Sequence, residues 1–228
     1  MEDESGRRAI EALRATIAGC RACAEAGHFI DGSPLLGAGP CPAPLFVLGQ
    51  APALVHTQKP GRPPFSPSRH GQPSPLWKWL EQAGFAAEEF RDLAYITAVT
   101  RCYPGRARNG SGDRRPSAAE QQLCSRYWRR ELALVQPRLV LALGTLALDA
   151  LGAGRRRLDE VVGQVLTMTA PDGRPLPLIP LPHPSGVSRW LNTAAHRAQL
   201  DQALAILADE RPALAGAALG VGLPEARQ

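Results

Sequence analysis

The sequence predicts an α/β fold: a three-layer α/β/α sandwich with a central, mostly parallel sheet of four strands. Short apolar runs alternate along the chain with longer segments of helical periodicity, an order typical of parallel strands joined by crossover helices. The apolar runs are continuous, as expected for strands that are covered on both faces. At 228 residues the chain is long enough for one such domain. We assign residues 1–210 to this domain and expect the Ala/Gly-rich residues 211–228 to form a disordered tail.

The first half of the chain supplies two of the predicted strands. Residues 7–19 place apolar side chains at helical spacing, and the first strand follows at 44–49 after a connection rich in glycine and proline. After a long loop, Ser74 caps a helix that ends near Gly84. The second strand is predicted at 93–100.

The second half continues the alternation. An arginine-rich loop leads to a long helix that opens with a capping box formed by Ser117 and Glu120. The third strand is predicted at 137–144, and a fourth, interrupted by prolines, lies within 175–186. The last predicted helix covers 189–210.

Composition indicates the compartment and the kind of partner. No apolar run approaches 18 residues and the polar N-terminus lacks a signal peptide's apolar stretch, so we expect a cytoplasmic, nucleoid-associated protein that contacts no membrane. The net charge of +5 is compatible with a polyanionic partner. Nearly all the positive charge is arginine, which we attribute mainly to GC-rich codon usage, although guanidinium groups also fit phosphate geometry.

Four of the five cysteines suggest a metal site. Cys20 and Cys23 form a CxxC pair, and Cys102 and Cys124 are two distant single cysteines. Thiolates bind soft metals and stay reduced in the cytoplasm, so these four could form a site for zinc or for an iron–sulfur cluster. Ordinary buried thiols are the alternative, and they are our expectation for Cys41.

The unusual loops all leave the carboxyl end of a predicted strand. GQAPA (49–53) follows the first strand, TRCYPG (100–105) the second and HPSG (183–186) the fourth. Because ligands of parallel α/β sheets bind beyond the carboxyl ends of the strands, we expect these loops to form one site.

Taken in order, these segments resemble the uracil-DNA glycosylase superfamily, specifically its iron–sulfur branches, families four and five. The resemblance covers roughly residues 15–210 and includes the CxxC, GQAPA, GRPPF (61–65), YITAVTRC (95–102), Cys124 and PHPSG (182–186). It implies an enzyme that flips a damaged base out of DNA, hydrolyses its N-glycosidic bond and leaves an abasic site.

The resemblance also implies roles for residues of the base site. His183 would be the catalytic group that donates a hydrogen bond to uracil O2 as charge develops on the departing base; a structural histidine is the alternative. Phe65 would stack on the flipped base, unless it is simply a core residue. The backbone from Gly49 through Gln50 and Ala51 would shape the floor of the site.

The same resemblance implies a DNA-binding loop after the fourth strand. Ser185 and Gly186 would contact phosphates beside the lesion, and Val187 lies where relatives insert a wedge side chain. Arg189 would bind a further phosphate. An ordinary surface loop is the alternative.

Three positions depart from the pattern of the relatives. Gln50 stands where family four carries an acid, and Ser68 where family five carries an aspartate. Ala98 replaces the Asn that reads the uracil edge in many relatives. We therefore expect weak or altered activity; His56 and His70 are the nearby titratable groups, with solvated loop histidines as the alternative.

The cofactor and partners follow from the resemblance. It implies a [4Fe–4S] cluster, with zinc as the alternative, that pins the arginine loop against DNA and is bound by Cys20, Cys23, Cys102 and Cys124. The expected partner is DNA containing uracil or a deaminated base, bound by a monomer. One alternative function is a non-catalytic binder of damaged or single-stranded DNA, and another is covalent capture of an abasic sugar by a histidine.

Overall fold

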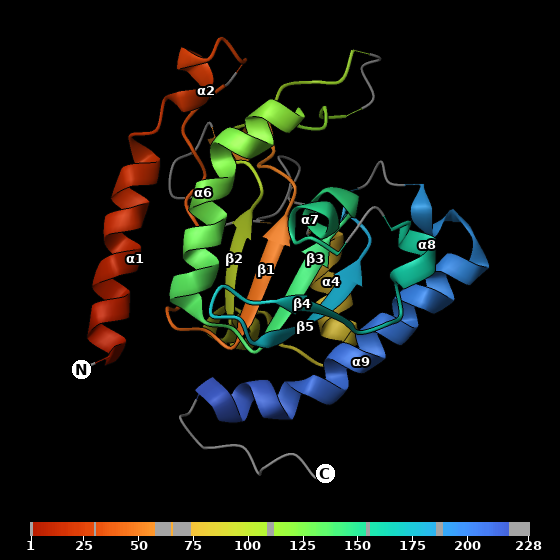
Figure 1. Ribbon diagram of the computed structural model, residues 1–228. Helices are drawn as coiled ribbons and strands as arrows, with labels where there is room; N and C mark the ends of the chain where they lie inside the picture. The colour runs from red at the N-terminus through yellow and green to blue at the C-terminus, as the bar shows by residue number, and fades with distance from the viewer. Residues whose placement is uncertain are drawn as a thin grey trace.

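The computed structural model describes residues 2–29, 31–57, 65, 74–108, 112–153, 156–185 and 189–218. A five-stranded sheet with the order β2–β1–β3–β5–β4 forms its centre (Figure 1). The parallel strands are β1 (Leu45–Gly49), β2 (Ala94–Ala98), β3 (Leu139–Leu143) and β5 (Pro175–Leu181). The edge strand β4 (Leu166–Thr169) pairs antiparallel with β5. The mostly parallel sheet is confirmed, but the predicted number of four strands was wrong.

The missed strand, β4, has no strong sequence signal. It contains only four residues, and its side chains alternate between half-buried and exposed rather than forming a continuous apolar run. A tight turn joins it to β5, in which Ala170 N–H donates to Arg174 O at 2.9 Å and Gly173 adopts a φ of 87°. Such a short edge strand is defined by its pairing partner more than by its own composition.

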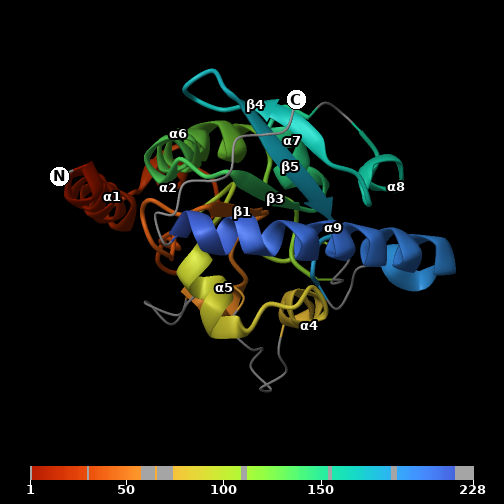
Figure 2. The same ribbon diagram turned by 90° about the horizontal axis from the view of Figure 1, so that it is seen from below.

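Helices cover both faces of the sheet, as predicted (Figures 1 and 2). One face carries α1 (Glu2–Ala18), α6 (Ala118–Val135) and α7 (Thr145–Ala150), and the other carries α4 (Pro75–Gln82), α5 (Ala87–Leu93) and α9 (Ala194–Ala218). The shorter helices are α2 (Ala22–Glu25), α3 (Leu54–Thr57), α8 (Leu158–Val161) and the 3-10 turn η1 (Trp190–Asn192).

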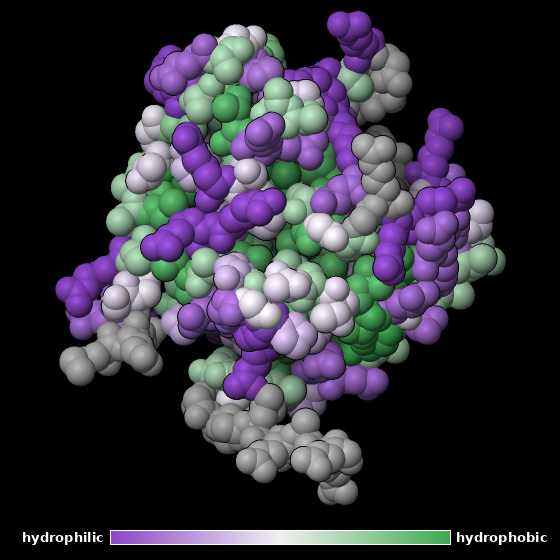
Figure 3. Space-filling view, viewed as in Figure 1, coloured by the Kyte–Doolittle hydropathy of each residue, from purple (hydrophilic) through white to green (hydrophobic). Residues whose placement is uncertain are grey.

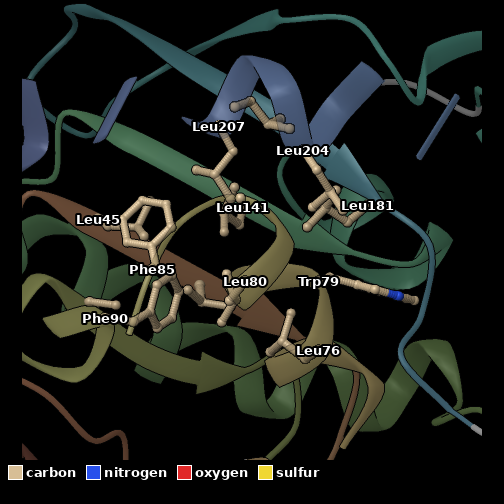
Figure 4. Packing of buried hydrophobic residues seen from close by; sticks show 14 of the residues in the cluster. Leu45, Leu76, Trp79, Leu80, Phe85, Phe90, Leu141, Leu181, Leu204 and Leu207 are labelled. Atoms are coloured by element: carbon tan, nitrogen blue, oxygen red, sulfur yellow. The ribbon is translucent and has the colours of Figure 1, made fainter. Parts of the chain in front are cut away.

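Alternate side chains of β1 divide the core into two layers. Phe46 and Leu48 pack in the layer beneath α1, α6 and α7, whereas Leu45 and Val47 pack toward α4, α5 and α9. Figure 4 shows the second layer, where leucines of β1, β3, β5 and α9 meet the aromatic side chains of the α4–α5 region. A strand that is buried on both faces explains its continuous apolar run.

Local signals at helix ends are confirmed. Ser74 Oγ accepts a hydrogen bond from Leu76 N–H at the start of α4, and Gly84 follows its end with a φ of 84°. At the start of α6, Ser117 and Glu120 exchange the two bonds of a capping box.

The expected disordered tail was wrong for residues 211–218, because α9 continues through them. Leu214 is 2% exposed, and Arg211 Nε bonds Glu89 Oε1 of α5 at 2.8 Å. These contacts keep the chain helical through Pro212, although a proline inside a helix normally breaks it. Residues 219–228 lie outside the described residues. Among the described helices, none combines the length and apolar character needed to cross a membrane.

Candidate active site and cysteine pocket

The loops expected to form the site begin at one edge of the sheet. Gly49, the last residue of β1, pairs with Ala98, the last residue of β2. In the other half of the sheet, Leu143 of β3 pairs with Leu181 of β5. The GQAPA, TRCYPG and HPSG loops therefore all leave from the carboxyl ends of parallel strands, the upper ends in Figure 1.

Phe65 lies against the end of β1 because Gly49 has no side chain. A Cβ on Gly49 would stand 3.2 Å from Phe65 Cζ, closer than most real Cβ contacts. Phe65 is half-buried and packs against the core. The structure thus brings together two of the residues that the sequence assigned to the base site.

His183 occupies the equivalent position at the end of β3. Gly144 has a φ of 82°, and a Cβ there would stand 3.0 Å from His183 Cβ. Glycine is therefore required both by the backbone conformation and by the approach of the histidine. We call Gly49, Phe65, Gly144 and His183 the base site; Gly49 ends β1, and Gly144 directly follows the adjacent strand β3.

Burial sets the protonation state of His183. Desolvation lowers its pKa, and the charge of Asp113 partly opposes this by raising the pKa. Because the net pKa lies below the ordinary value of about 6.5, the imidazole is neutral at pH 7 and carries one N–H that it can donate.

Asp113 is a charged residue beside the strand ends that sequence reasoning missed. Its carboxylate accepts a hydrogen bond from Tyr103 Oη at 2.9 Å, and its backbone bridges to Arg106 across the arginine loop. Through these contacts the loop carries a negative charge that acts on His183. The available signal was that Asp113 is the single acid between Arg101 and Pro116.

The first two strand ends are joined through their backbones. Val99 N–H donates to Gly49 O at 2.9 Å, and Thr100 N–H donates to Gln50 O at 3.2 Å. These bonds extend the β1–β2 ladder past Ala98, which is buried, and hold the start of the GQAPA loop in place. Ala51, the next residue, is half-buried.

The predicted DNA-binding residues are described only in part. Ser185 N–H donates to His183 O at 2.8 Å, a tight turn that follows β5 directly. Arg189 is exposed just before η1. His56 lies in α3. The remaining predicted positions lie outside the described residues: Gly186, Val187, Ser68 and His70.

All four motif cysteines line a single pocket beside the strand ends. We call it the cysteine pocket; its other lining residues include Phe29, Arg101, Tyr103, Glu120 and Tyr127. All five cysteines of the chain are free thiols, and Cys41 is buried elsewhere in the core. Among the described residues, no three His, Cys, Asp or Glu side chains are arranged to hold a single metal ion. The pocket nevertheless gathers all four thiols in one place.

The thiols of the cysteine pocket differ in acidity. Burial, together with the neighbouring cysteines, raises the pKa of Cys102 to about 12, and burial raises that of Cys124 to about 11. For Cys20, burial also opposes ionisation, but hydrogen bonds from Tyr127 and Arg126 outweigh it and lower the pKa. Ionised thiols this close to one another repel, so they suit a positively charged metal group that would replace their protons.

A fully buried ion pair connects the cysteine pocket to β2. Arg101 is 1% exposed and donates to Glu131 of α6, which is 0% exposed, and to Thr97. Glu131 also accepts bonds from Thr97 Oγ1 at 2.8 Å and Tyr95 Oη at 3.0 Å. The backbone N–H of Arg101 donates to Cys124 Sγ at 3.3 Å. Glu131 and Cys124 are seven residues apart, so both face this turn from one side of α6.

The arginine loop has both paired and unpaired cations. Arg114 bonds the buried Glu120 at 2.7 Å and lowers the pKa of that carboxyl to about 2, and Arg115 bonds Asp149 at 2.8 Å. Arg106 and Arg108 are exposed and make no ion pair within the described part of the chain. In Figure 3, hydrophilic side chains project from the upper end of the molecule, where this loop lies.

The comparisons with known proteins agree with this geometry. No curated protein matches the sequence. The family model described as the uracil DNA glycosylase superfamily matches residues 36–207, which include the whole sheet and all four residues of the base site. Since this match covers well over half of the 228 residues, the chain belongs to the uracil DNA glycosylase superfamily.

Proposed function

We propose that this protein is a DNA repair glycosylase that flips uracil, or another deaminated base, out of DNA and hydrolyses its N-glycosidic bond to leave an abasic site. Membership of the superfamily supports the reaction class. The observation that carries the proposal is the base site itself. An aromatic ring and a neutral imidazole lie at the ends of adjacent strands, each against a glycine.

Recognition of the base begins with stacking. The half-buried Phe65 ring would offer a flat apolar surface to a flipped base, and the backbone of Gly49, Gln50 and Ala51 would form the floor. Flipping costs a few kcal/mol and is easiest at a mismatched or damaged base, which favours uracil opposite guanine.

Bond cleavage depends on stabilising the departing base. As the glycosidic bond breaks, negative charge develops on uracil O2, and the N–H of neutral His183 donates to it. A single preorganised donor of this kind is typically worth roughly 10²–10³ in rate. No proton transfer is required, because the base leaves as a stabilised anion.

The attacking water needs a group that orients or activates it, and here the sequence differs from that of the relatives. Gln50 and Ala98 provide no charge, so the carboxylate of Asp113 is our candidate to orient water or to stabilise positive charge on the sugar. Its position on a loop rather than on a strand end fits weak or altered activity.

We also propose that the cysteine pocket holds a [4Fe–4S] cluster through Cys20, Cys23, Cys102 and Cys124, with zinc as the alternative. Four thiols that line one pocket supply the number of ligands that such a cluster needs. When bound, the group would cross-link the N-terminal segment to β2 and α6, a structural role.

Metal analysis tests the cofactor. We expect about four irons and four sulfides per chain, lost in Cys102→Ser but kept in Cys41→Ser, because Cys41 lies outside the pocket. One zinc per chain without iron would instead support a zinc site and contradict the cluster. Full metal content in Cys102→Ser would contradict the ligand assignment.

Base release tests the enzyme. Excess protein is incubated with labelled oligonucleotides that carry uracil opposite guanine, opposite adenine or in a single strand, followed by alkali. We expect strand breaks that fall by about 10²–10³ in His183→Ala. Equal cleavage by wild type and His183→Ala would remove His183 from the mechanism.

A non-catalytic binder of damaged or single-stranded DNA is the second candidate, favoured by the uncharged Gln50 and Ala98. Under that function the oligonucleotides would stay intact after alkali. Uracil-containing DNA would nevertheless be retained in a gel shift in preference to its thymine counterpart.

A further inference from the structure

We infer that Trp77 is a positioning residue for the base site: its indole N–H holds the backbone of Phe65 so that the ring stays over the end of β1. The inference rests on the proposed function, in which the Phe65 ring stacks on the flipped base. Trp77 lies on α4, outside every loop that contributes to the base site.

Phe65 needs such support because its backbone is in an unfavourable conformation. Its φ is 56°, in the left-handed region that bulky L-residues rarely adopt. A residue in this region persists only where its surroundings hold it, and such residues concentrate at functional sites. The backbone of Phe65 is therefore a point at which one added hydrogen bond has a large effect on side-chain direction.

Trp77 supplies that bond. Its Nε1–H donates to the carbonyl oxygen of Phe65 at 2.8 Å, a short and partly buried hydrogen bond. Because the indole N–H is only a donor and the carbonyl only an acceptor, the polarity of this bond is unambiguous. Fixing the carbonyl fixes the peptide plane, and the ring is then directed toward Gly49, 3.2 Å from the position of an added Cβ.

The indole is itself held from two helices. Trp77 N–H bonds Ser74 O at 3.0 Å in the capped first turn of α4. The ring meets Phe90 of α5 edge-on, with 6.0 Å between ring centroids, and the Arg91 guanidinium lies 4.8 Å from its centroid. Because the indole is fixed, its N–H can keep the strained backbone of Phe65 in place, whereas a mobile indole would move together with Phe65.

The test compares two tryptophans of one helix. Trp77→Phe keeps an aromatic ring against α5 and removes only the donor. Trp79→Phe is the matched control, because Trp79 is buried in the core and makes no hydrogen bond to Phe65 among the described residues (Figure 4). Single-turnover rates on uracil oligonucleotides are measured over a range of protein concentrations, with the melting temperature of each variant alongside.

We expect Trp77→Phe to raise the half-saturating protein concentration by about 3- to 10-fold, the effect of one hydrogen bond, and to lower the saturating rate less. Trp79→Phe should lower the melting temperature without raising the half-saturating concentration. Equal changes in both variants would reduce Trp77 to a packing residue and overturn the inference.

A spectroscopic measurement keeps the inference separate from the proposed function. In ¹⁵N–¹H spectra of the wild type, assigned with Trp77→Phe, the Trp77 indole proton should exchange with water at least tenfold more slowly than a free indole. In Trp77→Phe, the Phe65 amide signal should shift or broaden. Rapid exchange of the indole proton would overturn the inference even in an active enzyme. An intact, protected bond in a protein that neither cleaves nor prefers uracil DNA would instead overturn the proposed function.

Discussion

The cysteine pocket and the base site lie at the same edge of the sheet, but they are stabilised differently. Beside the cysteines, a buried ion pair between Arg101 and Glu131 joins β2 to α6. At the base site, Gly49 and Gly144 leave space that Phe65 and His183 occupy, and charge has little part in their placement. One region is held by a buried ion pair, and the other by the shape of the backbone together with the single hydrogen bond from Trp77 to Phe65.

This difference determines how each region should fail. A buried charge that loses its partner destabilises the whole fold, because it remains desolvated. A side chain added at a strand end instead displaces its neighbour by a fraction of an ångström, which affects geometry and rate more than folding. Substitutions in the ion pair should therefore lower mainly stability, and substitutions at the base-site glycines should lower mainly activity.

Glu131→Leu should have the largest effect of the variants considered. It leaves the Arg101 guanidinium buried without a counter-ion, so we expect a loss of about 3–5 kcal/mol in the free energy of unfolding. Urea denaturation of the protein, followed by circular dichroism, measures this loss.

The double variant Arg101→Met/Glu131→Leu is the control for that measurement. With both charges removed, we expect it to recover most of the lost stability, since apolar replacements of buried pairs are often close to neutral. A single variant that loses less than about 1 kcal/mol would mean that water reaches the pair, and the contrast between the two regions would disappear.

Gly144→Ala should affect activity more than stability. The added methyl group would stand 3.0 Å from His183 Cβ and move the imidazole, so we expect about a 10²-fold loss in the rate of base removal. Single-turnover kinetics on uracil opposite guanine measures it.

Gly152→Ala is the control for this substitution. Gly152 also has a positive φ, 77°, but nothing lies within 4 Å of its added Cβ. Each variant should lose at least about 1–2 kcal/mol of stability from its positive φ, and Gly144→Ala should lose more, because its ψ of 171° lies in a region that only glycine adopts readily. Should Gly152→Ala lose as much activity as Gly144→Ala, backbone strain rather than contact with His183 would be responsible.

The sequence predicted the parts of this molecule that depend on local physical chemistry. Continuous apolar runs and the caps at Ser74 and Ser117 identified the parallel strands and the principal helices. The sequence also predicted that Gly49 and His183 lie at the same edge of the sheet, because the carboxyl ends of parallel strands lie together.

The features that were missed depend on contacts between distant segments. Nothing in the sequence near Arg101 indicates that its guanidinium is buried against α6, 30 residues away. Similarly, the helical conformation of residues 211–218 depends on Glu89 and on the burial of Leu214. The bond from Trp77 to Phe65 is non-local as well, and it involves a backbone carbonyl, which no residue type reveals.

Asp113→Asn should change the pH dependence of the base site. The Asp113 carboxylate favours the protonated imidazole, so its removal lowers the pKa of His183 further below the ordinary value of about 6.5. The inflection that His183 gives to the pH–rate profile should therefore move to lower pH. Asp31→Asn, which removes another negative charge near Tyr103, should leave the inflection in place. An unchanged inflection in Asp113→Asn would mean that the Asp113 carboxylate does not act on His183.

The same shift makes a prediction about stability. Because the folded-state pKa of His183 lies below its unfolded value, the unfolded chain binds the proton more readily. Neutral His183 therefore contributes its stability above about pH 6.5, and this contribution is lost as the pH falls through the folded-state pKa. In His183→Ala, the free energy of unfolding should depend less on pH over this range, as measured by urea denaturation at several pH values.

Arg106→Gln should have the smallest effect and tests whether the cysteine side of the edge contacts DNA. Arg106 is exposed and has no ion pair among the described residues, whereas the neighbouring Arg115 bonds Asp149. If Arg106 binds a phosphate, its loss should weaken uracil and thymine DNA about equally and reduce the slope of log affinity against log salt by about one. Arg115→Gln is the paired control and should change the slope less. A change in the preference for uracil, rather than in the salt slope, would place Arg106 in base recognition and would blur the division between the two regions.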